Sequence, residues 1–341
     1  MNNEIKESGN LFDKEGNLLE NGWARKLILN YNKEDIRVGK KSLRIKEWDC
    51  YCIVNESYCL TLIIADIGYF GMGTISWIDF KNQEQKNGGA IKLFTRGKLN
   101  MPPTADTGDV SFKRNKFKLN FKREGDYRVL SVANPGFCND KGIEGEVKLY
   151  QDPEMDTMVN VIPFKNKKHF VYVQKVNCMP TSGSIRIGED RYDFSDKDTF
   201  SCLDWSRGVF PYKTSWYWGS ASGIIDGKMV GFNIDYGFGD ESVASKNMIF
   251  HEGKGHKLDQ ITFHINKKDF MEPWRFTSND GRFEMTLNPV YHEKTNLNLL
   301  FLKTSGHKVY GYYNGDLILD NGEKLHIDNL FGFAENFHHR W

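Results

Sequence analysis

The sequence predicts an all-β protein built from two antiparallel β-barrels, with few and short helices. Three observations lead to this prediction. Polar and apolar residues alternate in short segments, dipeptides typical of tight turns are frequent, and a block of aromatic and glycine residues occurs twice. Alternation with a period of two is typical of antiparallel strands that bury one face. Several such strands separated by turns favour a barrel or a meander.

The alternation is clearest in residues 116–122, 169–173 and 261–265. Long segments with apolar residues at the helical spacing are missing, so we expect short helices only, near residues 195–203 and 267–271. Turn dipeptides, which supply the positive φ angles of tight hairpins, lie between the alternating segments at Asn21-Gly22, Gly88-Gly89, Asp226-Gly227, Asp280-Gly281, Asn314-Gly315 and Asn321-Gly322.

The repeated block starts at Trp48 and again at Trp216, and it ends at Phe80 and Phe250. The two copies span 80 − 48 = 32 and 250 − 216 = 34 positions. Two barrels of related design explain both the repeat and the chain length of 341 residues; coincidence within an aromatic-rich chain is the alternative. We therefore expect an N-terminal segment that packs on the barrels (1–40), a first barrel (41–190) and a second barrel (191–341).

The composition narrows the classes of function. Lys and Arg number 46 against 45 Asp and Glu, which gives a net charge of +1. No global basic field is available to hold nucleic acid, so we expect no nucleic-acid partner. Aromatic residues make up 14% of the chain, and this content favours a hydrophobic small molecule as the ligand.

The compartment is expected to be the cytoplasm. The first ten residues are polar and show no secretory signal. The longest apolar run, residues 59–70, is shorter than the roughly 20 residues that span a bilayer, so no transmembrane segment is expected. The six cysteines are then reduced thiols. Cys50 and Cys52 share one face of a strand, but no second ligand pair accompanies them, so we expect neither a metal nor a cofactor.

Basic residues concentrate between Lys113 and Arg128, where they alternate with apolar side chains and form the outer face of a strand. Such a face suits a peripheral contact with an anionic membrane surface, or with nucleic acid. A solvated edge that resists aggregation is the simpler interpretation.

The most concentrated chemical feature lies between Asp204 and Gly219, which contains three Trp, two Tyr, one Asp and one Arg. An aromatic wall binds apolar or conjugated ligands and stabilises a developing cation. We predict Asp204 as an acid, with ligand-binding roles for Trp205, Arg207, Tyr212, Trp216 and Trp218. In the alternative interpretation the tryptophans pack between the barrels and Asp204 pairs with Arg207.

A second feature follows at residues 235–240. Asp235 lies within an apolar run, where a carboxylate must point outward, be paired or be functional. We predict Asp235 as a second catalytic acid, with Tyr236 and Asp240 binding the ligand. A strand kinked at Gly237 and Gly239 that ends in a solvated acidic turn is the alternative.

Several motifs resemble those of domain-of-unknown-function family 2804. They are Gly22–Arg25, Lys46–Asp49, Asp204–Tyr212 with Trp216–Gly219, Gly237–Asp240, Pro273-Trp274, Asp280–Glu284, Gly332–Glu335 and Arg340-Trp341. Ser206, where glycine is usual, and the pair His338 and His339 depart from the family pattern. The family is distantly similar to calycin-like proteins with two lipocalin-type barrels, such as carotenoid 1,2-hydratase and certain pericyclases and isomerases that work without a cofactor. The resemblance therefore implies two lipocalin-like barrels.

Two hypotheses about function follow. The first is a cofactor-independent hydratase, isomerase or cyclase acting on an apolar or unsaturated molecule in an aromatic barrel pocket, with Asp204 or Asp235 as the acid. The second is a non-catalytic carrier of a hydrophobic ligand. An enzyme requires a carboxyl group that faces the ligand, whereas a carrier does not.

Overall fold

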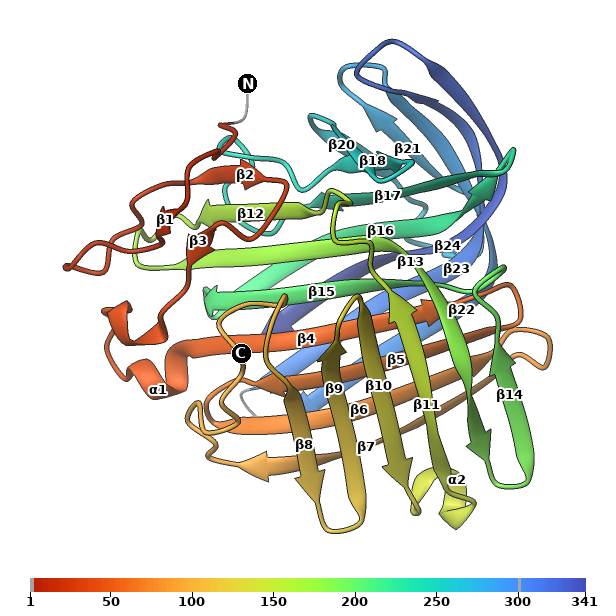
Figure 1. Ribbon diagram of the computed structural model, residues 1–341, viewed down its shortest axis with the longest axis horizontal. Coiled ribbons are helices and arrows are strands. Elements are labelled where there is room, and N and C mark those ends of the chain that lie inside the picture. The colour runs from red at the N-terminus through yellow and green to blue at the C-terminus, as the bar shows by residue number, and fades with distance from the viewer. Residues whose placement is uncertain (1–2, 300–301) are drawn as a thin grey trace.

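The computed structural model describes residues 3–299 and 302–341, and it consists mainly of two large sheets (Figure 1). Each sheet curls until its outer strands approach one another: β8 returns to β5, β6 and β7, and β20 returns to β17. The structure thus confirms the all-β class and the two barrel-like units that the sequence predicts.

The first sheet contains 13 strands, ten of them in one continuous path. In spatial order these are β7 (Glu84–Leu93), β6 (Phe70–Asp79), β5 (Tyr58–Asp66), β4 (Ile45–Val54), β15 (Phe200–Val209), β13 (Phe170–Ile187), β11 (Ile143–Tyr150), β10 (Tyr127–Asn134), β9 (Phe117–Glu124) and β8 (Val110–Arg114). Off this path, β13 also pairs with β12 (Met158–Pro163) and β14 (Asp190–Phe194), and β12 pairs with β2 (Gly22–Ala24).

The second sheet contains nine strands, all antiparallel to their neighbours. Their spatial order is β19 (Lys254–Lys257), β18 (Met248–His251), β17 (Lys228–Tyr236), β16 (Lys213–Ile225), β24 (Lys324–Arg340), β23 (Leu302–Ile318), β22 (Phe283–Leu299), β21 (Trp274–Ser278) and β20 (Ile261–His264). A small parallel pair, β1 (Gly9–Asn10) with β3 (Leu29–Asn30), lies in the N-terminal segment.

Each barrel-like unit has its own apolar interior. Large side chains that are fully buried in the first unit are Trp77, Phe112, Phe137, Tyr172 and Trp205. Those in the second unit are Phe232, Trp274, Phe276, Phe283 and Tyr313. Because successive side chains of a strand point to opposite faces, the other face of each central strand is left to form contacts between the two sheets.

The contact between the sheets contains two further apolar clusters. In the first cluster, Cys52 of β4 and Phe80, which follows β6, pack against Tyr310 and Phe333 of the second sheet. In the second cluster, Val171 and Val173 of β13 pack with Phe210 and Phe238, which lie in loops that follow β15 and β17. Central strands of the first sheet are therefore buried on both faces. The cavity described below lies between the same two sheets.

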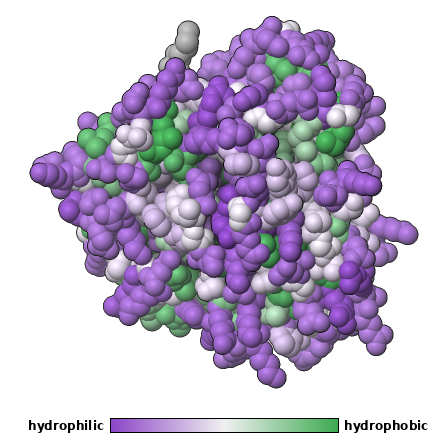
Figure 2. All heavy atoms as spheres, viewed as in Figure 1, coloured by the Kyte–Doolittle hydropathy of each residue, from purple (hydrophilic) through white to green (hydrophobic). Residues whose placement is uncertain are grey.

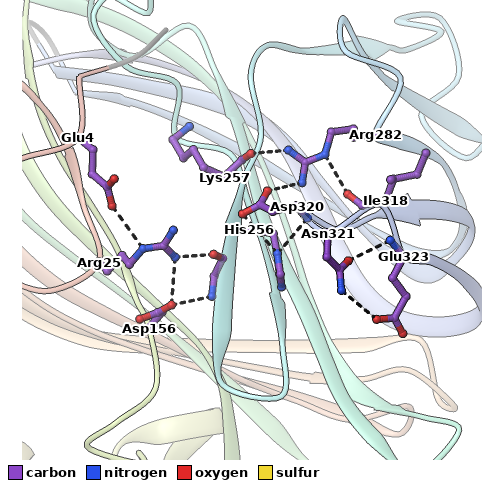
Figure 3. A network of polar contacts seen from close by, with 11 residues as sticks. Glu4, Arg25, Asp156, His256, Lys257, Arg282, Ile318, Asp320, Asn321 and Glu323 are labelled. Carbon is purple, nitrogen blue, oxygen red and sulfur yellow. Dashed lines mark hydrogen bonds and ion pairs between the residues drawn. The ribbon is translucent and has the colours of Figure 1, made fainter.

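The N-terminal segment connects the two sheets through polar contacts (Figure 3). The Arg25 guanidinium lies 3.4 Å from Glu4 and 3.0 Å from Asp156, and it donates to the carbonyl of Gly255 in β19. Neighbouring contacts in the second sheet centre on Arg282. The face of the molecule seen in Figure 2 is mostly hydrophilic, and its hydrophobic groups are small and separate.

The structure corrects the helices expected from the sequence. Residues 195–198 form a turn and Phe200 begins β15, while residues 267–271 lie in turns. Pairing of β15 with both β4 and β13 supplies the hydrogen bonds that favour a strand there. The helical elements among the described residues are η1 (Lys33–Asp35), α1 (Lys41–Arg44) and α2 (Phe137–Asp140).

The boundary between the sheets falls between Val209, the end of β15, and Lys213, the start of β16. It lies later in the chain than residue 190 because β14 and β15 pair within the first sheet. The division of the chain into an N-terminal segment and two domains at residues 40 and 190 stays a prediction.

Candidate functional site

A cavity of about 670 Å³ lies between the two sheets. Its walls come from the outer faces of β4, β5, β6, β7, β13 and β15 on one side, and from β16, β17, β22, β23 and β24 on the other. It reaches solvent near Asn87 and Leu297, which line it and are exposed. The sequence predicts an aromatic pocket within a barrel, whereas this cavity is outside both barrel interiors, which large side chains fill.

Strand register explains which residues of the first sheet meet at the cavity. Lys175 lies opposite Asp204, Asp204 opposite Cys50, Cys50 opposite Ile63 and Ile63 opposite Thr74. Directly opposed residues of antiparallel strands project from the same face. All five residues line the cavity. We call this set the first row.

The second sheet presents a matching row. Asp235 lies opposite Trp218, Trp218 opposite Glu335, Glu335 opposite Lys308 and Lys308 opposite Glu293. These five residues also line the cavity. This second row contains three carboxyl groups and one amine on adjacent strands, and it faces the first row.

Lys175 connects the two rows. Its Nζ lies 3.1 Å from Asp204 Oδ2 in its own sheet and 3.8 Å from the centre of the Trp218 ring in the other. Burial alone lowers the pKa of Lys175, but the charges of Asp204 and Asp235 outweigh burial and raise it. The ammonium is therefore kept charged beside two acidic side chains and an aromatic face.

Asp204 is held by three partners. Besides Lys175, the Trp48 indole N–H donates to its Oδ2 at 3.2 Å and the Ser206 hydroxyl donates to its Oδ1 at 2.8 Å. The side chain is 14% exposed. Its partner is thus Lys175, and the ion pair with Arg207 that one interpretation of the sequence expected does not form. These contacts fix one orientation of the carboxylate at the cavity wall.

Asp235 is more deeply buried. Lys246 Nζ lies 2.9 Å from its Oδ1, and the Asp235 backbone N–H donates to Asn247 Oδ1 at 2.7 Å. Burial raises the pKa of Asp235, while the nearby Lys246 and Lys175 act in the opposite direction. A carboxyl group with a raised pKa in an aromatic cavity is suited to proton donation.

A second buried carboxyl group, Glu335, faces the same space. Its Oε1 accepts the indole N–H of Trp216 at 2.8 Å, and its Oε2 lies 3.6 Å from Lys308 Nζ. Burial raises the pKa of Glu335, and Lys308 opposes this shift. The site therefore holds two carboxyl groups whose pKa burial raises, each beside a lysine.

The apolar wall consists mainly of aromatic side chains: Trp48, Trp216, Trp218, Phe238, Phe337 and Trp341. His339 completes it, stacked on Trp216 with 4.5 Å between ring centres and with Nδ1 3.2 Å from the Thr304 hydroxyl. Burial lowers the pKa of His339 to about 4. A neutral imidazole thus lies at the cavity near neutral pH.

The structure places two residues predicted from the 204–219 segment inside the first barrel. Trp205 is fully buried against Tyr172, with ring centres 5.4 Å apart. Arg207 is also fully buried, and its Nη1 lies 2.9 Å from Asp49. Both residues occupy odd positions of β15, and these point away from the face that carries Asp204 and lines the cavity.

Three other predicted residues lie on the surface and do not line the cavity. Tyr212 and Tyr236 are 46% and 48% exposed. Asp240 is exposed in a turn, where it accepts hydrogen bonds from the backbone and hydroxyl of Ser242. Asp235 and Tyr236 are adjacent in β17, so their side chains point to opposite faces. Of the predicted site residues, the cavity therefore brings together Asp204, Asp235, Trp216 and Trp218.

Sequence reasoning missed five charged residues that line the cavity: Lys175, Lys246, Glu293, Lys308 and Glu335. A signal was present for some of them, because Lys175 follows Phe-Val-Tyr-Val-Gln and Glu335 follows Leu-Phe-Gly-Phe-Ala. A charge inside an apolar run requires a partner or a function. The same argument singled out Asp235 and applies equally here.

The described part of the chain contains no group of three or more His, Cys, Asp or Glu side chains arranged to hold a metal ion. Within residues 3–299 and 302–341, no helix is long and apolar enough to cross a membrane. All six cysteines are free thiols.

The fold and the cavity define a class of protein with two curled antiparallel sheets and a site between them. The chain belongs to the family described as Domain of unknown function (DUF2804), which it matches over residues 2–341. The resemblance stated from the sequence motifs is thereby confirmed. No curated protein matches the chain.

Solved structures that are similar to this one include the following two. The crystal structure of an AttH protein from Nitrosomonas europaea has a TM-score of 0.51 and 12% identity, covering 90% of this chain and 96% of that chain. Kievitone hydratase from Nectria haematococca has a TM-score of 0.46 and 9% identity, covering 87% of this chain and 88% of that chain. At this identity the likeness to the AttH protein shows a shared fold and nothing about activity.

Proposed function

We propose that this protein is a cofactor-independent acid–base enzyme, a hydratase, isomerase or cyclase, whose substrate is an apolar or unsaturated small molecule. The observation that carries the proposal is the pair of facing rows, which put carboxyl groups and lysines around an aromatic cavity. The volume of about 670 Å³ lies within the roughly 300–1,000 Å³ typical of small-molecule sites.

Asp235 is proposed as the proton donor, because burial raises its pKa. Asp204 is proposed as the proton acceptor, because Lys175, Trp48 and Ser206 all bind its carboxylate form. Trp216 and Trp218 supply electron-rich ring faces beside a cation that develops on the substrate. Trp205, Arg207, Tyr212, Tyr236 and Asp240 have no part in this proposal.

For a hydration, the steps balance without a cofactor. The Asp235 carboxyl group transfers its proton to one alkene carbon, and the adjacent carbon becomes electron-deficient. A water oxygen adds to that carbon, and the proton that the water loses passes to Asp204. Proton exchange with solvent returns both carboxyl groups to their starting states. An isomerisation follows when a carbon-bound proton leaves instead of water adding.

A non-catalytic carrier of a hydrophobic ligand is the second candidate. It is favoured by the ion pairs of the site, Lys175 with Asp204 and Lys246 with Asp235, which already satisfy the charges without a substrate. In a carrier the aromatic wall binds the ligand, and each carboxyl group neutralises a lysine of its own half of the site.

The test separates binding from proton transfer. Binding is followed by the fluorescence of retinol, an uncharged polyene, and proton transfer by deuterium uptake from D₂O into a panel of alkenes, enones and enol ethers. We expect Asp235→Asn to bind retinol as the wild type does but to lose deuterium uptake by about 100-fold or more. Asp240→Asn, the same change in an exposed turn, is the matched control and should keep both activities.

Two results would count against the enzyme. If the wild type binds retinol but transfers deuterium to no compound of the panel, the carrier is the better description. If Asp235→Asn and Asp240→Asn take up deuterium equally, Asp235 is not the donor. Retinol binding by each variant also reports that the cavity has formed.

A further inference from the structure

An unusual surface feature lies at the end of β7, an outer strand of the first sheet. Ile91, Leu93 and Phe94 are 39%, 72% and 63% exposed. Single exposed apolar residues are ordinary on soluble proteins, but three within four positions form a contiguous group. We call these three residues the β7 patch.

The charges of two segments beside the β7 patch are of one sign, whereas the loop that joins these segments carries Asp106 and Asp109. Residues 90–98 and 110–118 contain seven charged side chains, all basic and all exposed: Lys92, Arg96, Lys98, Lys113, Arg114, Lys116 and Lys118. The two segments touch, because the Arg114 guanidinium donates to the carbonyl of Ile91 and Lys92 Nζ lies 5.2 Å from the centre of the Phe112 ring. Basic side chains of two contacting segments therefore lie beside the patch, in a chain whose net charge is only +1.

Protection of a sheet edge does not explain this arrangement. Proteins guard an edge by placing charged residues or proline on it in place of apolar ones. Here Leu93 and Phe94 remain exposed beside the charges. Nucleic acid is also a poorer fit, since aliphatic side chains such as Ile91 and Leu93 neither stack on bases nor bond to their edges.

An anionic membrane surface matches both properties. Each Lys or Arg near such a surface contributes about 1 kcal/mol of attraction, and exposed Leu and Phe side chains gain free energy on entering the headgroup and acyl boundary. The β7 patch and its basic surroundings provide both kinds of contact in one continuous region of the first barrel.

The β7 patch also adjoins the cavity. Ile91 lies directly opposite Met72, which lines the cavity, and Asn87 and Gly88 of the same strand line it as well. Leu297, exposed on the facing sheet, belongs to the same lining. The patch thus lies beside the end of the cavity that Met72, Asn87 and Leu297 line, where an apolar molecule leaving a bilayer could enter.

We propose that this protein docks reversibly on anionic membranes through the β7 patch and the basic residues of β7 and the β8–β9 hairpin. The docked protein then takes its apolar ligand from the bilayer. Only the second statement rests on the proposed function; docking itself is independent of any chemistry in the cavity.

The experiment is co-sedimentation of the full chain with vesicles of phosphatidylcholine alone and of phosphatidylcholine mixed with phosphatidylserine. We expect binding to the mixed vesicles that weakens as salt is raised. The double variant Leu93→Ser with Phe94→Ser should bind about tenfold more weakly or worse, since two apolar contacts are lost. Leu19→Ser, a change at a residue 55% exposed elsewhere, is the control and should bind normally.

A second pair of variants tests the charges. Lys113→Gln with Lys116→Gln should weaken binding to the mixed vesicles, whereas Lys228→Gln with Lys254→Gln, two exposed lysines of the second sheet, should not. Equal binding to neutral and mixed vesicles, or equal loss in the two pairs, would overturn the proposal. So would binding of a DNA duplex in place of vesicles, or a dimer that the patch variants abolish.

The two proposals fail separately. If vesicle binding is absent while deuterium uptake persists, docking alone is wrong. If vesicle binding follows the pattern above but no compound takes up deuterium, the chemistry is wrong and docking stands. Transfer of retinol from mixed vesicles should be slower in the Leu93→Ser and Phe94→Ser variant, while its binding of retinol in solution stays unchanged.

Discussion

Replacing Asp204 by Asn tests whether the buried ion pair that Asp204 of β15 forms with Lys175 of β13, within the first sheet, stabilises the fold. Lys175 is 4% exposed and lies 3.1 Å from Asp204. Removing one partner of a buried pair usually costs about 3–5 kcal/mol, because an uncompensated charge remains. Lys175 keeps the ring of Trp218 3.8 Å away, so we expect a smaller loss in the free energy of unfolding, about 2–4 kcal/mol.

The single variant Lys175→Met and the double variant that combines it with Asp204→Asn complete a double-mutant cycle. Because the double variant has no unpaired charge, it should be less destabilised than the sum of the single variants, with a coupling energy of about 1–3 kcal/mol. Urea unfolding is followed by tryptophan fluorescence and by far-UV circular dichroism, and free energies are compared where the two transitions coincide. A loss below about 0.5 kcal/mol for Asp204→Asn, or additive single changes, would refute the reasoning.

Three further predictions follow from the structure. Since burial lowers the pKa of His339 from 6.5 to about 4, its neutral form stabilises the fold above pH 6.5 and this contribution is lost as the pH falls toward 4. Urea unfolding of His339→Gln should therefore depend less on pH in that range than that of the wild type; parallel curves would contradict this. Arg207→Ala leaves Asp49 buried without its partner, so the free energy of unfolding at pH 7, measured with urea, should fall by about 3–5 kcal/mol. Part of this lost free energy should be recovered at pH 5. No recovery would show that loss of packing dominates. Trp205→Ala should cost about 3–5 kcal/mol and leave retinol affinity unchanged in protein that still folds, whereas Trp216→Ala should weaken retinol binding; the reverse pattern would place the site inside the first barrel.

Much of the architecture could be predicted from local pattern. The alternation at residues 116–122 corresponds to β9, and those at 169–173 and 261–265 correspond to the start of β13 and to β20. Turn dipeptides such as Asp226-Gly227 lie between paired strands, here β16 and β17. Such signals are local: a strand with one solvated face, such as β9, has to alternate, and a tight turn requires residues that accept positive φ. The start of β13 is a strand as expected, but it is buried on both faces.

The composition of the site was only partly predictable. Asp235 was found because a carboxylate in an apolar run needs an explanation, and Asp204 because aromatic residues surround it in the sequence. The segment around Asp204 also suggested Trp205 and Arg207, which point into the first barrel. β15 is buried on both faces, so its sequence carries no polar face from which the orientation of each residue could be read.

By itself, the sequence determined the β class, turns such as Asp226-Gly227, the family and two carboxyl groups of the cavity. Two dipeptides expected as turns, Gly88-Gly89 and Asn314-Gly315, lie inside β7 and β23 instead. Only the tertiary structure decided which side chains meet. Lys175, Glu293, Lys308 and Glu335 lie far apart along the chain and converge through the register of β13, β22, β23 and β24. Register is set by packing across the sheet, and a shift of one residue turns every side chain of a strand to the opposite face. The site is therefore a property of the paired strands and of the contact between the two sheets, and no local segment contains it.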